Sequence, residues 1–314
     1  MNNNVYLGFD TSNYTTSIAV CNDEGQVIAN IKKLLDVKQG ERGLRQSDAV
    51  FSHIKNLPLL ADELAKATEG CTVKAIGVSA TPRDAEGSYM PCFLVGKALA
   101  SIVAATHSVP VYEFSHQSGH IMSALYSSGK LGELIKNDFV AFHVSGGTTE
   151  AVLVKPAVNG FNVEILAETA DISAGQAIDR AGVMMGLKFP CGRELEALAK
   201  DYKGKIPKQK ICVQDGKCNL SGVENIAQKL YAETNDKNFV SAYVLNFVAH
   251  TLVGLTEQIR EKHPNIPILY AGGVMSNKFL QNKLSSFDNT YFATPELSCD
   301  NAVGISLLAK RTNQ

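Results

Sequence analysis

Short apolar segments alternate along the chain with longer segments of helical spacing, and this pattern predicts an α/β protein. Residues 5–9, 17–21 and 26–31 are apolar and are separated by polar turns, as in three strands that meander back and forth. Residues 48–67 have the apolar spacing of a helix, which we expect Pro58 to interrupt. The remaining elements of the first half are then a loop at 38–46, a strand at 75–79, a helix at 93–106 and a strand at 109–114.

The second half of the chain repeats this opening. Residues 139–144, 151–155 and 161–167 are again short apolar segments, and Thr148-Thr149 precedes the second of them as Thr15-Thr16 does in the first half. Such self-similarity indicates a duplicated unit. We therefore predict a duplicated α/β fold of two lobes, residues 1–137 and 138–314, with a ligand cleft between them at the strand ends and a last helix that returns to the first lobe. The later elements are expected as helices at 172–185, 223–232, 240–262, 278–286 and 301–310 and strands at 268–271 and 290–292.

Composition narrows the class of protein. Lys and Arg total 30 against 31 Asp and Glu, a net charge of -1, which excludes nucleic-acid binding through bulk positive charge but not through a local basic patch. The mean hydropathy of -0.03 and the lack of a long uncharged apolar run argue against a membrane span, and the N-terminus does not have a signal-peptide pattern. The seven cysteines include no CxxC pair, which argues against disulfides and structural zinc. We expect a cytoplasmic globular protein that does not contact membranes.

Two Gly-Gly turns follow predicted strands, and a third polar turn, Asp10-Thr11-Ser12, follows the first strand. The Gly-Gly turns are Ser145-Gly146-Gly147-Thr148-Thr149 and Ala271-Gly272-Gly273-Val274. Paired glycines let backbone N–H groups approach a phosphate closely, although one such pair alone is better explained as a tight turn. Because two pairs occur at equivalent ends of a duplicated fold, we favour a nucleotide-binding site.

Two histidines have the spacing of metal ligands. His116 and His120 lie on one face if they fall in the first turn of a helix, and Asp300 is a candidate third ligand. From the spacing alone we favour the alternative, a helix capped by Ser115 with two unrelated histidines, because an isolated HxxxH is a weak signal. Asp300 is likewise more often an N-cap. The other histidines are expected to be structural or solvated: His53, His107, His143, His250 and His263.

A glycine lies within the helical pattern that begins near residue 172. Gly175 costs about 1 kcal/mol there relative to alanine, so we expect another backbone segment to pass close to it. Asp179 follows one turn later on the same face and could accept both hydroxyls of a ribose. The alternative is a surface ion pair of Asp179 with Arg180 or a neighbouring residue.

A lysine-rich stretch follows this helix and contains Gly204 and Pro207. One interpretation is a flexible basic loop that touches RNA phosphates. The interpretation that we favour from the sequence is a solvated connector. Its lysines are Lys203, Lys205, Lys208, Lys210 and Lys217.

In their order along the chain, these motifs resemble the TsaD/Gcp family, formerly called O-sialoglycoprotein endopeptidases. The resemblance covers nearly the whole chain. It implies the duplicated actin/sugar-kinase/Hsp70-like fold and the transfer of a threonylcarbamoyl group from threonylcarbamoyl-adenylate to N6 of adenosine 37 in tRNA. The matching motifs are Asp10-Thr11-Ser12, His116-Gln117-Ser118-Gly119-His120, Val144 to Thr149, Ala174 to Arg180, Pro190-Cys191-Gly192, Leu220-Ser221-Gly222, Ala271 to Asn277 and Asp300-Asn301.

The resemblance also implies roles for individual residues. His116, His120 and Asp300 would hold one divalent metal, and imidazoles with one carboxylate fit iron or zinc. Ser145, Gly146, Gly147, Thr148 and Thr149 would contact the phosphate of an adenine nucleotide, which is threonylcarbamoyl-adenylate, AMP or ATP. The remaining expected site residues are Asp10 and Ser12 in the catalytic turn, Asp179 at the ribose, and Gly192, Gly272, Gly273 and Asn277 around the nucleotide.

Several positions depart from the family pattern. An acidic pair is usual where this chain has Tyr14 and Thr15, and the usual His within Ser-Gly-Gly-His-Thr is Thr148. Replacing a carboxylate by tyrosine removes a charge and a potential general base. A non-catalytic, nucleotide-binding paralogue that scaffolds partners is therefore our second hypothesis. The other departures are Val223-Glu224 for Leu-Lys, Gln176 for Glu, and residues 81–91 in place of a Gly-Pro-Gly loop.

A metallopeptidase is the third and weakest hypothesis, because the Glu of HExxH sites is missing. The resemblance implies tRNA and small accessory proteins as partners, one a shortened homologue and another a P-loop ATPase. The resemblance does not exclude that the protein forms a dimer.

Overall fold

The computed structural model describes residues 3–12, 14–36, 44–158, 160–297 and 301–314, which form two compact units. The first unit comprises Met1–Leu131, Pro156–Asn162 and Leu297–Gln314, and the second comprises Gly132–Lys155 and Val163–Glu296. The division expected after residue 137 therefore differs from the structure. The C-terminal helix, which was expected to return to the first lobe, belongs to the first unit, and so does the hairpin tip Pro156–Asn162, so a single boundary does not describe the chain.

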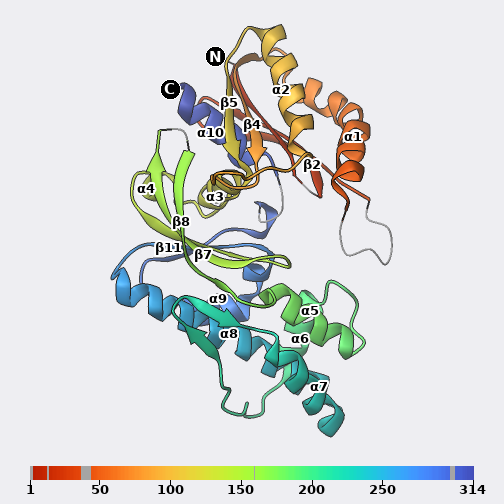
Figure 1. The fold of residues 1–314 in the computed structure, drawn as a ribbon, viewed down its shortest axis with the longest axis vertical. Helices are drawn as coiled ribbons and strands as arrows, with labels where there is room; N and C mark the ends of the chain where they lie inside the picture. The colour runs from red at the N-terminus through yellow and green to blue at the C-terminus, as the bar shows by residue number, and fades with distance from the viewer. Residues whose placement is uncertain (1–2, 13, 37–43, 159, 298–300) are drawn as a thin grey trace. The chain divides into compact units, whose positions relative to one another are not determined.

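A five-stranded sheet forms the centre of the first unit, in the order β3-β2-β1-β4-β5. The first three strands pair antiparallel, as a meander requires, and β4 and β5 extend the sheet in parallel. Helices α1 and α2 lie together against one face (Figure 1). The elements are β1 (Asn4–Thr11), β2 (Thr15–Asn22), β3 (Val27–Leu34), α1 (Gln46–Ala67), β4 (Thr72–Thr81), α2 (Phe93–His107), β5 (Val111–Ser115) and α3 (His116–Ser127).

The C-terminal helix α10 (Val303–Asn313) packs on the other face of this sheet, where two glycines make room for it. Gly8 and Gly77 are neighbours in the register of β1 and β4. A Cβ atom at Gly8 would lie 2.5 Å from Ser306 N, and one at Gly77 would lie 2.6 Å from Ile305 O. Because those atoms belong to the backbone of α10 or its first turn, any side chain at either glycine would push the helix away.

A seven-stranded sheet forms the centre of the second unit, in the order β12-β11-β6-β7-β8-β10-β9. β6 and β7 pair antiparallel, whereas β11 joins β6 in parallel. The elements are α4 (Leu131–Leu134), β6 (Phe139–Val144), β7 (Thr149–Ala157), β8 (Gly160–Thr169), α5 (Ala174–Met184), α6 (Gly192–Asp201), β9 (Cys212–Gln214), β10 (Lys217–Asn219), α7 (Gly222–Thr234), α8 (Lys237–Lys262), β11 (Ile268–Ala271), η1 (Gly273–Ser276), α9 (Lys278–Leu284), β12 (Thr290–Phe292) and η2 (Pro295–Leu297).

The two sheets share one strand order. β3-β2-β1-β4-β5 in the first unit corresponds to β8-β7-β6-β11-β12 in the second, strand for strand along the chain. β2 begins at Thr15 and β7 at Thr149, so the repeated Thr-Thr pair marks the start of the second strand in both. The duplicated α/β fold predicted from the sequence is confirmed.

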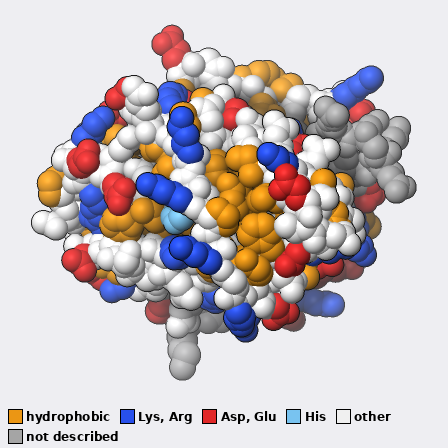
Figure 2. Space-filling model, turned by 90° about the horizontal axis from the view of Figure 1, so that it is seen from below, with side chains coloured by type: hydrophobic (Ala, Val, Ile, Leu, Met, Phe, Trp, Pro, Cys, Tyr) orange, Lys and Arg blue, Asp and Glu red, His pale blue; other side chains and the backbone are white. Residues whose placement is uncertain are grey.

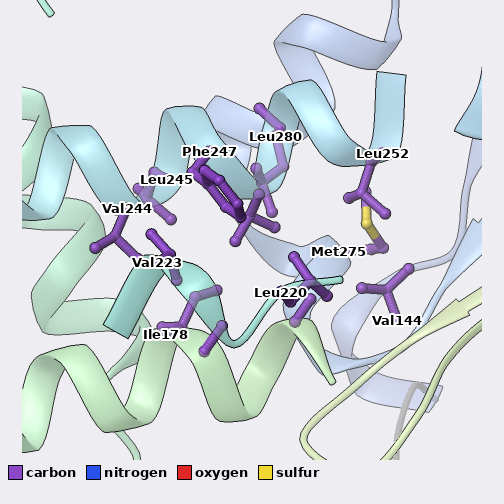
Figure 3. Packing of buried hydrophobic residues seen from close by; sticks show 14 of the residues in the cluster. Val144, Ile178, Leu220, Val223, Val244, Leu245, Phe247, Leu252, Met275 and Leu280 are labelled. Carbon is purple, nitrogen blue, oxygen red and sulfur yellow. The ribbon is translucent and has the colours of Figure 1, made fainter. Parts of the chain in front are cut away.

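The core of the second unit surrounds α8. Val244, Phe247 and Leu252 of this helix pack with residues of α5, α7 and η1, such as Ile178 and Met275 (Figure 3). By length and composition α8 is apolar enough to cross a membrane, a feature that the sequence analysis overlooked. However, 78% of its most apolar window is buried inside the protein, so its apolar surface is explained by packing within the unit.

Some local expectations were wrong. Pro58 does not interrupt α1, which continues from Gln46 to Ala67; proline removes one backbone hydrogen bond, and the buried face of α1, which includes His53 and Leu60, holds the helix together. Most of the loop expected at 38–46 lies outside the described residues. Helix α6 and the β9–β10 hairpin were not predicted, and the hairpin occupies part of the stretch interpreted as a connector.

Candidate functional site

The two histidines of the HxxxH motif lie in the first turns of α3. Ser115 caps this helix, since its Oγ accepts a hydrogen bond from Ser118 N at 3.0 Å. His116 and His120 therefore project from one face, with ring centroids 4.3 Å apart and the rings edge to face. The helix and its cap were predicted from the sequence, and the alternative that the two histidines are unrelated is wrong as to geometry, because the rings are in contact.

Asp10 at the end of β1 fixes one of these imidazoles. Its Oδ2 lies 2.7 Å from His116 Nδ1, and the carboxylate is 1% exposed. Ser79 Oγ also donates to Oδ2, at 2.5 Å, and Ser12 N donates to Oδ1, at 2.9 Å. A carboxylate on Nδ1 fixes the tautomer and the ring orientation and directs Nε2 toward a metal. These contacts make Asp10 a positioning group for His116.

A second carboxylate holds the start of the same helix. Asp84 Oδ2 accepts hydrogen bonds from Ser115 Oγ at 2.6 Å and from Ser118 Oγ at 2.9 Å. Gln117 N donates to Pro82 O at 3.1 Å. Residues 81–91, where this chain departs from the family pattern, thus anchor the helix that carries the two histidines. Sequence reasoning missed Asp84, because only the departure itself pointed to this segment.

The side chains of the first unit that could bind a metal suit an ion that prefers nitrogen and oxygen ligands. His116 and His120 supply two imidazoles from one helix, and a buried carboxylate supports one of them, as in many metal sites. Asp300, the expected third ligand, lies outside the described residues. Within the residues that the structure describes, no group of three or more His, Cys, Asp or Glu side chains is clustered for metal binding.

His53 lies beneath the turn between β1 and β2. Its Nδ1 is 2.9 Å from Thr16 Oγ1, which also accepts a hydrogen bond from Asn56 Nδ2 at 3.1 Å. Both Nε2 of His53 and Oγ of Ser12 are buried and have no hydrogen-bond partner. His53 was expected to be structural or solvated, and in the structure it is buried, which indicates a structural role.

Burial lowers the pKa of His53, while the Ser12 backbone and the charge of Asp10 act in the opposite direction. The unfolded chain therefore takes up a proton at His53 at a higher pH than the folded protein does, below the ordinary pKa of about 6.5. We expect this to reduce the free energy of unfolding as the pH falls below that value. Urea unfolding of wild type and His53→Gln at several pH values between 7.5 and 5 checks this: the stability difference between them should shrink toward acid, and a constant difference would contradict it.

In the second unit, the turn after β6 lies against the first turn of α5. Ser145 Oγ accepts hydrogen bonds from Gly147 N and Thr148 N, at 3.3 and 3.1 Å, which closes the turn. Gly146 and Gly147 are exposed, and an added Cβ at either would meet nothing within 4 Å. The open side of this turn thus presents glycine backbone to solvent, as phosphate-binding turns do.

Gly175 allows the contact between this turn and α5. Its N donates to Ser145 O at 3.1 Å, and an added Cβ would lie 2.6 Å from Gly146 Cα. The expectation that another backbone segment passes close to Gly175 is confirmed. Ser173 completes the junction, since it caps α5 together with Gln176 and donates from Oγ to Gly146 O at 2.7 Å.

The other expected nucleotide residues lie at the ends of neighbouring elements of this unit. Gly272, with φ of 101°, packs against the backbone of Val144 at the end of β6, and the Cβ position of Gly273 is open. Asn277 caps α9, with Oδ1 accepting from Leu280 N at 3.1 Å. The Cβ position of Gly192, the first residue of α6, is also open.

Asp179 is engaged at the start of α6. Its Oδ1 accepts a hydrogen bond from Cys191 N at 2.7 Å, and burial raises the pKa of this carboxyl. The alternative of an ion pair with Arg180 is wrong, because Arg180 Nη1 lies 3.1 Å from Glu224 Oε2 instead. Glu224 stands where the family usually has lysine, so this departure has a structural partner.

The carboxylate of Asp171 accepts hydrogen bonds from the Leu-Ser-Gly motif at residues 220–222. Burial by itself would raise its pKa, but hydrogen bonds from the Leu220 and Ser221 backbone, the Ser221 hydroxyl and Ile172 N hold the pKa well below its usual range. The motif is thereby tied to the junction between β8 and α5. Sequence reasoning missed this carboxylate, whose partners lie about fifty residues away.

Comparison with known sequences gives one consistent result. The sequence model of the family described as "TsaD: tRNA N6-adenosine threonylcarbamoyltransferase" matches residues 26–307. A curated tRNA N6-adenosine threonylcarbamoyltransferase of Streptococcus sanguinis is 29% identical over 298 residues, which cover 91% of this chain and 84% of that protein. The enzyme of the same name from Streptococcus pneumoniae strain Taiwan19F-14 is 29% identical over 300 residues, with the same coverage.

Comparison with solved structures shows the fold. HypF of T. kodakarensis superposes with a TM-score of 0.60 at 13% identity, over 99% of this chain and 48% of that one. Component A of (R)-2-hydroxyglutaryl-CoA dehydratase from Acidaminococcus fermentans gives 0.58 at 15% identity, over 98% of both chains. A ROK family glucokinase from Streptomyces griseus, in complex with glucose and AMPPNP, gives 0.55 at 13% identity, over 98% and 99%. The chain has the actin/sugar-kinase/Hsp70-like fold.

Proposed function

Because the chain belongs to the TsaD family of tRNA N6-adenosine threonylcarbamoyltransferases, we propose that it transfers a threonylcarbamoyl group from threonylcarbamoyl-adenylate to N6 of adenosine 37 in tRNA. The N6 nitrogen attacks the carbamoyl carbonyl carbon, and a new C–N bond forms. The bond between that carbon and the phosphate oxygen breaks, AMP leaves with the electron pair, and one N6 proton is released. The reaction needs groups that hold the adenylate and groups that stabilise charge on the carbonyl.

The observation that carries the proposal is the contact between Asp10 and His116. A buried carboxylate 2.7 Å from Nδ1, with His120 in ring contact, is the support that a ligating imidazole requires. We propose that His116 and His120, with Asp300, hold a divalent iron or zinc ion, which when bound polarises the transferred group. Asp84 and Ser115 keep the helix of these ligands in place.

The second unit would bind the adenylate. In this proposal the exposed Gly146-Gly147 turn and the first turn of α5 contact the phosphate, because both offer backbone N–H groups and the helix dipole favours an anion. Asp179 contacts the ribose through the carboxylate oxygen that does not accept the Cys191 N–H. Gly192, Gly272, Gly273 and Asn277 would line the remainder of the nucleotide site.

A non-catalytic role is the second candidate, and the β1–β2 turn favours it. Tyr14 and Thr15 replace the usual acidic pair, and Asp10 already accepts hydrogen bonds through both oxygens. A group to take the N6 proton is therefore not evident in this turn. On this hypothesis the chain binds an adenine nucleotide and scaffolds partner proteins. In either case we propose a cytoplasmic location and work with small accessory proteins, a shortened homologue and a P-loop ATPase.

Complementation decides between these functions. We expect the gene to restore threonylcarbamoyladenosine, measured by mass spectrometry of digested tRNA, in cells depleted of their own transferase. His120→Ala should restore none, whereas His107→Ala, on the exposed end of α2, should match wild type. Failure to restore the nucleoside, together with AMP or ATP binding by the purified protein, would assign the scaffold function.

A further inference from the structure

The segment before β9 is anchored to helix α8 and is not a free connector. Gln209 Nε2 donates to Tyr243 O at 2.7 Å, which identifies Oε1 as the acceptor of the hydrogen bond from His250 Nδ1, at 3.1 Å. Further along, an added Cβ at Gly254 would lie 3.3 Å from the side chains of both Ile211 and Val213. The segment therefore follows α8 from the level of Tyr243 to that of Gly254.

Alternation along this segment directs its lysines outward. Gln209, Ile211 and Val213 are partly buried against α8, whereas Lys208, Lys210 and Cys212, which alternate with them, are exposed. Side chains two residues apart on an extended chain point to the same side. Lys208 and Lys210 consequently stand side by side on the outer face, and the amide between them anchors the chain beneath.

The segments that carry these lysines and the part of α8 beneath them contain basic but no acidic residues, whereas the neighbouring helix α6 carries Glu194, Glu196 and Asp201. Residues 202–214, 237–256 and 272–287, which cover this segment, most of α8 and all of α9, contain no Asp or Glu. Burial and the positive charge of Lys283 on α9 lower the pKa of His250, which places Lys283 near the anchored segment. Lys205, Lys208, Lys210 and Lys283 are here called the lysine surface, and none of them forms an ion pair within the described part of the chain.

Aromatic and apolar groups lie among these charges. The rings of Tyr202 and Phe239 are in contact, with centroids 5.3 Å apart, and the Lys283 ammonium lies 5.7 Å from the centre of the Phe279 ring. The view of Figure 2 looks onto the end of the second unit that carries α7 and α8, where Lys and Arg side chains, with Asp and Glu side chains between some of them, surround an apolar area. A positive surface with aromatic side chains is typical of nucleic-acid binding.

We propose that the lysine surface binds the phosphate backbone of RNA. The chain as a whole has a net charge of -1, so four exposed lysines that form no ion pair within the described residues are a local concentration of positive charge. Lysine ammonium groups contact phosphates as point charges and read no sequence. The inference rests on the proposed function in one respect, that the RNA is tRNA, and assigns this surface to the tRNA body rather than to the modified base.

The test measures binding without turnover. The probe is a tRNA transcript with guanosine at position 37, which has an oxygen in place of the N6 amine, titrated by fluorescence anisotropy at several KCl concentrations. Lys208→Gln/Lys210→Gln should lower the slope of log K against log salt by about 2 and weaken binding roughly 10- to 100-fold near 0.1 M salt. The matched control, Lys155→Gln/Lys262→Gln, removes two exposed lysines elsewhere on the same unit and should bind as wild type does.

The outcomes separate this inference from the proposed function. Equal affinity and equal slope for the double variant and its control would overturn the lysine surface, whether or not adenosine 37 is modified in the complementation assay. Competition by polyglutamate as strong as that by RNA would also overturn it, in favour of an acidic protein partner. Lysine-dependent binding of the transcript without modification of adenosine 37 would instead support the surface and contradict the transferase function.

Discussion

His120→Ala is expected to leave the protein folded but without a bound divalent metal. The substitution removes one of two imidazoles that meet on α3 and keeps the hydrogen bond between Asp10 and His116. His116→Ala should also remove the metal, but it deprives a carboxylate that is 1% exposed of one partner, and leaving a buried charge short of a hydrogen bond costs stability. His120→Ala is therefore the cleaner variant.

Asp10→Asn should have an intermediate effect. An amide oxygen can still accept from His116 Nδ1, but the charge that strengthens the imidazole as a ligand is lost, and such changes weaken metal binding by about 10- to 100-fold. Elemental analysis of the purified proteins, followed by titration with zinc, measures the series. The expected order of affinity is wild type, then Asp10→Asn, then His120→Ala, with His107→Ala equal to wild type. Full metal content in His120→Ala would exclude the proposed ligands.

Features that depend on neighbouring residues were predictable from the sequence. The strands, the Ser115 cap and the unusual glycine at 175 all give local signals, since apolar period, capping chemistry and helix propensity act within a few residues. The duplication was visible for the same reason, because each half repeats its own local pattern. The structure shows the role of two of these residues. The Ser115 cap begins the helix that carries His116, and Gly175 leaves room for the Ser145-Gly146 backbone to pack against α5.

Features that join distant residues were not predictable. Asp10 and His116 are 106 positions apart, and although the last helix was expected to return to the first lobe, its contact with Gly8 was not. Exposed carboxylates such as Asp84 and Asp171 look in sequence like ordinary loop residues. Their roles become evident only when hydroxyl and backbone donors from other segments converge on them.

The lysine-rich stretch at residues 203–217 gives a third reason why a structural feature can be missed in the sequence. Gly204, Pro207 and the lysines dominate its composition and suggest a solvated connector. The period of two over residues 208–213 is present in the sequence, but polar Gln209 occupies an inward position, which hides the alternation. Since that side chain binds α8 through hydrogen bonds rather than apolar contact, a search for apolar periodicity does not detect it.

Gly175→Ala is expected to destabilise the second unit and to abolish adenylate binding. The added methyl would lie 2.6 Å from both Gly146 Cα and Ser145 O, and backbone atoms cannot rotate away as a flexible side chain can. Overpacking of this kind costs roughly 2–3 kcal/mol, which corresponds to a loss of about 5–10 °C in the unfolding temperature of a unit of this size. The turn must also move off α5, so the phosphate site proposed there is lost.

Two matched glycines separate packing from ligand contact. An alanine at Gly192 or Gly147 meets nothing within 4 Å, so both variants should unfold at or above the wild-type temperature, since alanine favours the helix at residue 192. Gly147→Ala should nevertheless weaken AMP binding in calorimetric titration, because its methyl projects from the side of the turn to which a phosphate would bind. Wild-type AMP affinity in both Gly175→Ala and Gly147→Ala would show that the nucleotide does not bind at this turn, even if Gly175→Ala unfolds early as the backbone contact requires.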